Sequence, residues 1–217
     1  MDGPILTHLK TTLHGVATGL LIPTIIILLL LLALTVIELG GLLVEILTEN
    51  RRKKVDISRL INQLQTKTAA EIKCTIERSQ LLQRQKAVLT ELVNNHDLPA
   101  SSRRALARRL LTAEEGHYYR LTDRTDLIAR LAPMFGLMGT LIPLGPGIIA
   151  LSRGDTQTLA DSLLIAFDTT VAGLAAAGVS FVISRWRKRW YQDHLDTLAA
   201  LMESLLEVFD HGRGSEK

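Results

Sequence analysis

An aspartate inside an apolar segment is the side chain most able to do chemistry in this sequence. Asp168 is the only charged residue between Ser162 and Ser184. An ionisable side chain within a membrane span is costly, and it usually faces a protein interior or a water path. Thr169 and Thr170 follow it directly, and carboxylate and hydroxyl oxygens can relay protons or coordinate sodium ions. Asp168 therefore indicates a functional site that faces a protein interior or a water path, unless it is a protonated or hydrogen-bonded packing residue.

Helical rotation separates this aspartate from the second threonine. Each residue of an α-helix advances by about 100°, so Asp168 and Thr170 lie about 200° apart around the helix axis. They cannot both face one central axis. If Thr170 lines a pore, Asp168 points toward a neighbouring subunit or toward another helix of the same chain.

Small residues repeat at helical spacing in two apolar segments. Ala132, Gly136 and Thr140 recur every four residues, a pattern that lets another helix approach closely. A second stripe recurs at steps of four, three, four and three residues, and it consists of Ala166, Thr170, Gly173, Ala177 and Ser180. Two such stripes on consecutive helices can line a narrow channel, clasp a partner helix or simply pack against each other.

Three long apolar segments must position these residues. One uncharged run lies between Lys10 and Glu38, a second extends from Leu131 to Ser152, and the third is the 162–184 segment. Each could cross a hydrocarbon core of about 30 Å as a helix. The first is the most apolar, since most residues from Leu20 to Ile37 are Leu, Ile or Val. We expect an all-α integral membrane protein with three transmembrane helices and long cytoplasmic helical extensions.

Composition and missing motifs exclude several other classes. The mean hydropathy of +0.21 argues against a soluble enzyme. Cys74 is the single cysteine, so the chain can form neither an internal disulfide nor a cysteine metal cluster. The sequence contains no phosphate-binding glycine loop, His-x-x-x-His, Cys-x-x-Cys or Gly-x-Ser-x-Gly motif. We therefore expect no enzymatic activity, no metal site and no cofactor other than a transported ion.

Basic residues set the expected orientation. Of the 25 Lys and Arg residues, 17 lie in 49–130 and 6 in 185–217, whereas the N-terminus and the loop after the second apolar segment carry one each. Because basic residues are enriched on the cytoplasmic side of membrane proteins, we expect the N-terminus outside and the C-terminus in the cytoplasm. The positive charge flanks the apolar segments, so it indicates contact with the lipid bilayer rather than with nucleic acid.

The cytoplasmic part is predicted to be helical. Apolar residues recur at helical spacing over 55–95, which predicts one long amphipathic helix. Pro99 followed by Ser101 or Ser102 predicts the start of a second helix, which we expect to continue into the second span. The expected divisions are an extracytoplasmic N-terminus over 1–14, transmembrane helix 1 over 15–48, a cytoplasmic helical region over 49–130, a transmembrane hairpin over 131–184 with its outer loop at about 152–158, and a cytoplasmic helix and tail over 185–217.

Two prolines predict a kink in the outer half of the second span. Pro143 and Pro146 each remove a backbone hydrogen-bond donor from a helix. Backbone carbonyls freed in this way near Met138 and Gly139 could face an ion path.

Two motifs in the predicted hairpin resemble those of a known family. Residues 131–140 read Leu-Ala-Pro-Met-Phe-Gly-Leu-Met-Gly-Thr, which is similar to the "APxxGLxGT" opening of the second span in the MotA/TolQ/ExbB proton channel family. Residues 156–174 are similar to the third-span pattern of that family, "LAxxIxxALxTTxxGLxxA". The order of one span, a long cytoplasmic stretch, a hairpin and a cytoplasmic tail resembles the three-span TolQ and ExbB proteins more than the four-span MotA.

The resemblance implies partners and a mechanism. In this family five copies of the channel subunit surround two transmembrane helices from a smaller single-span protein of the ExbD/TolR/MotB kind, and an aspartate on the partner helix carries the proton. Ion flow then drives rotation or other work through the extracytoplasmic domain of the partner. The resemblance thus implies a homopentameric motor subunit of the cytoplasmic (inner) membrane that conducts protons or sodium ions.

Residue by residue, the resemblance assigns the pore to threonines. Thr140 and Thr170 match the pore threonines of the family, whereas Asp168 departs from it, because the family usually has an apolar or small residue there and an acidic residue nearer the outer end of the span. Pro143 and Pro146 also depart from TolQ and ExbB. The alternative function is a non-conducting membrane scaffold that assembles partner transmembrane helices, which would leave Asp168 and the paired threonines without a role.

Overall fold

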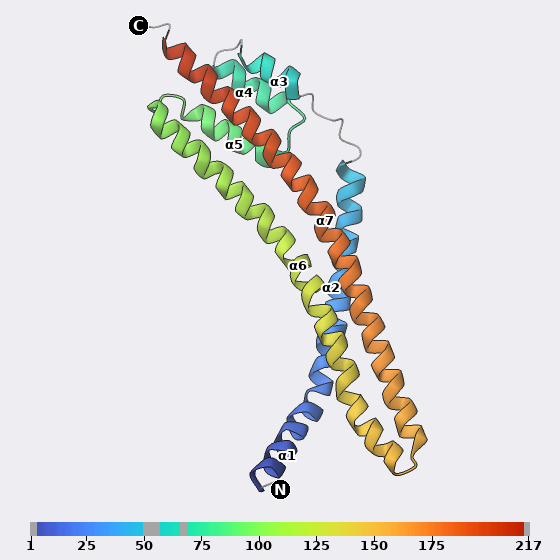
Figure 1. Cartoon of the computed structure of the whole chain (residues 1–217). Coiled ribbons are helices and arrows are strands. Elements are labelled where there is room, and N and C mark those ends of the chain that lie inside the picture. Colours follow the sequence, from blue (N-terminus) through green and yellow to red (C-terminus); the bar gives the residue numbers. More distant parts are fainter. Residues whose placement is uncertain (1–3, 50–56, 66–68, 215–217) are drawn as a thin grey trace. The chain divides into compact units, whose positions relative to one another are not determined.

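The described part of the chain is built from helices (Figure 1). The computed structural model describes residues 4–49, 57–65 and 69–214, and no strand occurs in these ranges. The helices are α1 (Pro4–Gly19), α2 (Leu21–Glu49), α3 (Ile57–Gln65), α4 (Ala69–Arg78), α5 (Gln83–Asn94), α6 (Ala100–Ser152) and α7 (Thr156–Gly214). The predicted all-α fold is confirmed.

Three helical segments are long and apolar enough to cross a membrane. They are Thr11–Leu47, Ala100–Ser152 and Thr156–Asp210, and each overlaps one of the three predicted spans. Helices α6 and α7 contain 53 and 59 residues, far more than the roughly 20 residues that a bilayer requires. The predicted continuation of the second and third spans into long helices is confirmed, because neither helix is interrupted.

The prediction of a single amphipathic helix over 55–95 is wrong. Three helices, α3 to α5, occupy the described part of this region, and residues 50–56 and 66–68 lie outside the described residues. The Ser79 hydroxyl donates to the Ile76 carbonyl (2.6 Å) where α4 ends, and the Leu82 N–H donates to Gln85 Oε1 (3.1 Å) where α5 begins. Side-chain hydrogen bonds of this kind satisfy the backbone groups that a helix end leaves without partners, so the chain turns here without Gly or Pro.

The start of α6 also differs from the prediction. The helix begins at Ala100, and the Arg103 N–H donates to the Pro99 carbonyl (2.9 Å). Ser101 and Ser102 lie inside the first turn with exposed side chains, so neither is the residue before the helix. Proline at this position gives up no hydrogen bond, because the first N–H groups of a helix have no partner within it.

Contacts divide the chain into two compact units. One comprises Met1–Val44 and Asp123–Arg185, and the other comprises Glu45–Thr122 and Trp186–Lys217. The second unit packs α3, α4 and α5 with its parts of α6 and α7 around a leucine-rich core. The buried core residues are Leu60, Leu64, Ile72, Ile76, Leu81, Val88, Leu89, Leu92, Val93, Ala107, Leu198, Leu201, Met202 and Leu205.

A buried arginine, Arg103, links α6 to α7 in the second unit. The Arg103 guanidinium is 1% exposed, donates to the His96 carbonyl (2.7 Å) and pairs with Asp210 near the end of α7. Arg104 contacts the same carboxylate at 2.8 Å. A buried charge is tolerated when it is paired and hydrogen-bonded in this way, so the pairing joins the first turn of α6 to the last turns of α7.

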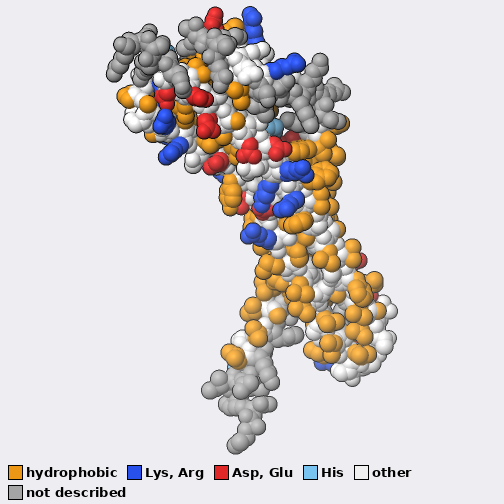
Figure 2. All heavy atoms as spheres, turned by 45° about the horizontal axis from the view of Figure 1, so that its top comes forward, with side chains coloured by type: hydrophobic (Ala, Val, Ile, Leu, Met, Phe, Trp, Pro, Cys, Tyr) orange, Lys and Arg blue, Asp and Glu red, His pale blue; other side chains and the backbone are white. Residues whose placement is uncertain are grey.

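The first unit contains the apolar hairpin of α6 and α7 together with α1 and most of α2. Leu31 of α2 packs with Ile128, Ala132 and Ala176 in one buried cluster. On the face shown in Figure 2, hydrophobic side chains cover much of the described surface of this hairpin. Such exposed apolar surface fits a helix pair that meets lipid or other protein rather than water.

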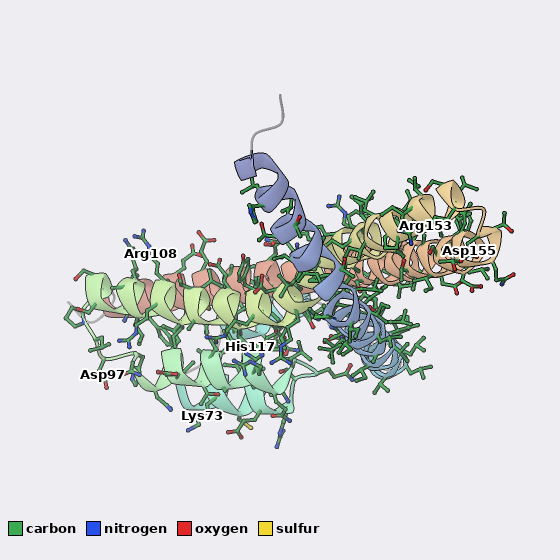
Figure 3. All side chains as sticks on the ribbon, turned by 90° about the horizontal axis from the view of Figure 1, so that it is seen from below. Lys73, Asp97, Arg108, His117, Arg153 and Asp155 are labelled. Carbon is green, nitrogen blue, oxygen red and sulfur yellow. The ribbon has the colours of Figure 1, made fainter. Side chains whose placement is uncertain are left out.

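The hairpin turn consists of two helix caps joined directly. Gly154 has a φ of +79°, the Gly154 N–H donates to the Leu151 carbonyl (3.0 Å), and the Asp155 N–H donates to the Ala150 carbonyl (3.0 Å). This is a Schellman ending, which favours glycine in the left-handed conformation. Asp155 then caps α7, because the Thr158 N–H donates to Asp155 Oδ1 (3.0 Å). Figure 3 shows Arg153 and Asp155 at this tip, so the connection is shorter than the predicted 152–158 loop.

Candidate functional site

Two glycines bring the backbones of α6 and α7 together. A Cβ built on Gly173 would lie 2.7 Å from the Ala132 carbonyl oxygen and 2.9 Å from the Gly136 Cα. Nearer the turn, a Cβ built on Gly147 would lie 3.0 Å from the Ser162 Cβ. The helices therefore approach as closely as small residues permit, which is the packing expected of small-residue ladders in membrane helices.

The buried face of α7 matches the predicted small-residue stripe except at two positions, where the buried residue is the one before the predicted residue. Ala166, Gly173 and Ser180 are buried as the small-residue stripe suggests. Thr169 and Ala176 complete the buried face, whereas Thr170 and Ala177 are half-buried. Residues three or four apart share a helix face, and both sets satisfy that rule, so only the facing helix decides between them. On α6, Ala132 and Gly136 are buried as expected.

Thr169 packs between the two helices of its own chain. A Cβ built on Gly139 would lie 2.6 Å from both the Thr169 Cβ and the Thr169 Oγ1. The Thr169 side chain is 7% exposed, and its hydroxyl donates to the Ile165 carbonyl (2.8 Å). The absence of a side chain at Gly139 is therefore what makes room for Thr169, and this contact determines the rotation of α7.

Thr140 and Thr170 lie on one flank of the hairpin. Thr140 follows Gly139 in the sequence, and Thr170 follows Thr169. One residue further along an α-helix, the side chain points about 100° away. Because α6 and α7 are antiparallel, these two rotations bring Thr140 and Thr170 to the same side of the helix pair. Both side chains are half-buried. The Thr140 hydroxyl donates to the Leu137 carbonyl (2.7 Å) and the Thr170 hydroxyl to the Ala166 carbonyl (2.8 Å). We call this face, which bears Thr140 and Thr170, the threonine flank.

Asp168 lies on the other side of α7. It precedes Thr169 by one residue, so the same rotation turns it away from the threonine flank. Its side chain is exposed on this chain. The structure therefore does not bring Asp168 together with Thr170, in agreement with the separation of about 200° that two helical residues impose.

A carboxylate and a hydroxyl that sequence reasoning missed also join the two helices. The Ser184 hydroxyl of α7 donates to Asp126 Oδ1 of α6. Ser184 is buried and Asp126 is half-buried. The two residues are 58 positions apart, and no local motif marks them. The only signal in the sequence is that Asp126 lies two heptads before Thr140 and Ser184 two heptads after Thr170.

A second buried hydroxyl contact joins α2 to α7. Thr35 Oγ1 and Ser180 Oγ lie 3.1 Å apart, and both side chains are at most 3% exposed. Interhelical hydroxyl bonds of this kind stabilise membrane helix packing by about 1 kcal/mol. Ser180 belongs to the predicted small-residue stripe of α7, but nothing in the sequence linked it to Thr35.

The prolines of the second span lie within a continuous helix. Pro133, Pro143 and Pro146 are all inside α6. Pro143 is buried and Pro146 is exposed. Each proline leaves a carbonyl one turn earlier without its usual N–H partner. These carbonyls belong to Gly139 and Ile142 for the two outer prolines.

The described residues contain no group of three or more His, Cys, Asp or Glu side chains that could hold a metal ion. The candidate site is the hairpin itself, because its two helices bring threonine hydroxyls to its middle and a carboxylate to the end away from the turn. Hydroxyl and carboxylate oxygens in such a place can pass protons or bind a hard cation.

Comparison with known proteins identifies the family of the chain. Residues 59–200 match the family model described as the MotA/TolQ/ExbB proton channel family. This match covers all of α4 and α5, all of α6 and most of α7, and so it includes every residue of the hairpin. No curated protein matches the chain significantly. The chain is a membrane protein and belongs to the MotA/TolQ/ExbB proton channel family.

Proposed function

We propose that this chain is the ion-conducting subunit of an energy-transducing motor in the cytoplasmic (inner) membrane. Five copies assemble around two transmembrane helices of a single-span partner of the ExbD/TolR/MotB kind, which carries an intramembrane aspartate. The ion is the proton, with sodium as the alternative. The N-terminus and the 153–155 turn lie outside, and the C-terminus lies in the cytoplasm, as the distribution of Lys and Arg predicts.

The observation that carries this proposal is the threonine flank. Gly136, Gly139 and Gly173 hold α6 and α7 in close contact, and this contact turns Thr140 and Thr170 to the same side of the pair. An ion crossing a bilayer needs oxygen ligands at the depth where water is absent. Copies of this hairpin around a partner helix would provide a ring of such hydroxyls.

Asp168 has a secondary place in the proposal. Its exposed carboxylate lies in an apolar segment, where an ionisable group is costly unless protein or water covers it. We infer that a neighbouring subunit covers Asp168, which would make it a lateral ion or packing site rather than part of the threonine flank.

A non-conducting scaffold is the second candidate function, and one observation favours it. The hydroxyls of Thr140 and Thr170 both donate to carbonyls of their own helices, as threonines in purely structural helices do. A scaffold would use the close packing of α6 and α7 only to present surfaces to partner helices.

Proton flux into vesicles separates these two functions. The complex, purified from native membranes and reconstituted with a pH-sensitive dye inside the vesicles, should conduct protons when a potential is applied. Thr170→Val removes the hydroxyl at nearly constant volume and should abolish the flux while the assembly stays intact. Thr197→Val is a matched control, because the Thr197 hydroxyl donates to the Asp193 carbonyl at 2.8 Å on the same helix. Wild-type complexes without any flux would favour the scaffold.

A further inference from the structure

The Asp126–Ser184 pair lies in line with the two threonines. Asp126 precedes Thr140 by two heptads on α6, and Ser184 follows Thr170 by two heptads on α7. Two heptads change the direction of a side chain by only about 40° in a straight α-helix. Asp126 and Thr140 therefore share one face of α6, and Ser184 and Thr170 share one face of α7.

The hydrogen bond between the pair supports this alignment. Because α6 and α7 are antiparallel, a step toward the N-terminus of α6 corresponds to an equal step toward the C-terminus of α7. Starting from Thr140 and Thr170, two heptads of such steps lead to Asp126 and Ser184, and these two side chains do contact each other. The pair thus lies about 21 Å from the threonines along the helix axes, at 1.5 Å per residue, on the side away from the 153–155 turn.

The surroundings of Asp126 suit a group that takes up and releases a cation. Its side chain is half-buried, so it borders both the hairpin and the space outside it. The Ser184 hydroxyl, which is buried, donates to the carboxylate, and a hydrogen bond to an ionised acceptor is stronger than a neutral one. This bond holds the carboxylate in one place. An ionised carboxylate has about four lone-pair sites, so it can accept a cation while it keeps the bond from Ser184.

We propose that Asp126 is the carboxylate that receives the transported cation at the cytoplasmic end of the threonine flank, and that Ser184 positions it. The inference rests on the proposed function, because it requires that an ion pass along that flank. For a proton, the carboxylate gains it from the path and then gives it to cytoplasmic water, so Asp126 returns to its ionised form and no other reactant is needed. Asp126 is the ion-binding group here, and Ser184 is a positioning residue.

A purely structural role for Asp126 predicts a different response to substitution. The side chain of Asp126→Asn can still accept the hydrogen bond from Ser184 through its carbonyl oxygen, so packing of the two helices is maintained. It cannot accept a proton or bind a cation through a negative charge. Asp126→Glu keeps the carboxylate and shifts it by one methylene group. The two variants therefore separate cation transfer from helix packing.

The test is proton flux through the complex reconstituted in vesicles, with sodium followed in parallel by a sodium-sensitive dye. We expect Asp126→Asn to lower the flux by about a hundredfold, the smaller end of the effect of a positioned proton-transfer group. Asp126→Glu should retain most of the flux. Ser184→Ala should lower it, and Ser184→Thr, which keeps the hydroxyl, should restore it. Asp123→Asn is the matched control, because Asp123 is an exposed acid three residues earlier on α6.

Three results would overturn the inference, and they can be told apart. If Thr170→Val abolishes the flux while Asp126→Asn conducts like wild type, the proposed function stands and Asp126 has no part in it. If the wild-type complex carries neither protons nor sodium ions, the proposed function fails and the role of Asp126 fails with it. Equal losses in Asp126→Asn and Asp126→Glu would also contradict cation transfer, because they would indicate a packing defect.

Discussion

Replacing Gly173 by alanine should destabilise the α6–α7 hairpin, because the facing helix leaves no room for a Cβ. The added atom would lie 2.7 Å from the Ala132 carbonyl oxygen and 2.9 Å from the Gly136 Cα. Both neighbours are backbone atoms, which cannot turn away as a flexible side chain could. The helices would have to separate by about 0.7 Å to lengthen the shorter contact from 2.7 to 3.4 Å, where ordinary van der Waals contact begins. Overpacking of this kind costs about 1–3 kcal/mol.

Gly178→Ala is the matched control for this substitution. Gly178 lies on the same helix, five residues further on, and a Cβ built there meets nothing within 4 Å. Alanine has a higher helix propensity than glycine by about 1 kcal/mol, so Gly178→Ala should leave the protein as stable as before or slightly more so. The free energy of unfolding can be measured by titration with SDS in mixed micelles, followed by circular dichroism. Equal stability of the two variants would refute the backbone contact between α6 and α7.

Three further predictions concern single contacts. Gly139→Ala should be destabilising, because the added Cβ would lie 2.6 Å from the Thr169 Cβ. Adding Thr169→Gly should restore part of the lost stability. A double-mutant cycle measured by SDS unfolding would give the coupling energy between the two positions, and additive effects would contradict the contact. Gly154→Ala should cost about 1–2 kcal/mol in the same assay, because the φ of +79° is strained for any residue with a Cβ, and an unchanged unfolding midpoint would contradict the Schellman turn. The arginines beside Asp210 hold the pKa of its carboxyl below the usual range, so the stability from this group is present above its unfolded-state pKa of about 3.9 and is lost as pH falls through the lower folded-state pKa. The melting temperature of Asp210→Asn should not show this loss at acid pH. The same dependence of melting temperature on pH in variant and wild type would contradict a stabilising role of the Asp210 carboxyl.

The three spans could be predicted from the sequence because the bilayer imposes a simple requirement. An uncharged run such as the one between Lys10 and Glu38 has to be long and apolar, and both properties are visible without any knowledge of tertiary contacts. The continuity of α6 and α7 beyond the spans could also be predicted, because the helical spacing of apolar residues continues on both sides of the hairpin. The prolines did not alter this result, since a helix can pass through them at the loss of individual hydrogen bonds.

The division of residues 57–94 into α3, α4 and α5 could not be predicted from periodicity. A continuous amphipathic helix and a helical hairpin show the same spacing of apolar residues, because every helix in a small core buries one face. The turn between α4 and α5 lacks Gly and Pro and depends on the Ser79 hydroxyl and the Gln85 side chain. Such caps are weak signals when they occur within an otherwise helical pattern.

The sequence predicted the face of α7 that packs against α6 only to within one residue along the chain. Ala166, Gly173 and Ser180 belong to both the predicted and the observed stripe, but the choice between Thr169 and Thr170 depends on which α6 residue faces them. Thr169 faces α6 because the opposite residue, Gly139, has no side chain and leaves room for it. The Asp126–Ser184 pair could not be predicted either. It depends on the register of α6 against α7, and the two residues are 58 positions apart in the chain.

The most direct test of the proposed motor is the subunit stoichiometry of the complex, purified gently from native membranes and measured by native mass spectrometry. We expect five copies of this chain with two copies of a single-span protein that has an aspartate in its transmembrane helix. That result would support the conducting pentamer and would identify the partner whose outer domain receives the work. A monomer or dimer of this chain without such a partner would contradict the motor and would favour the scaffold.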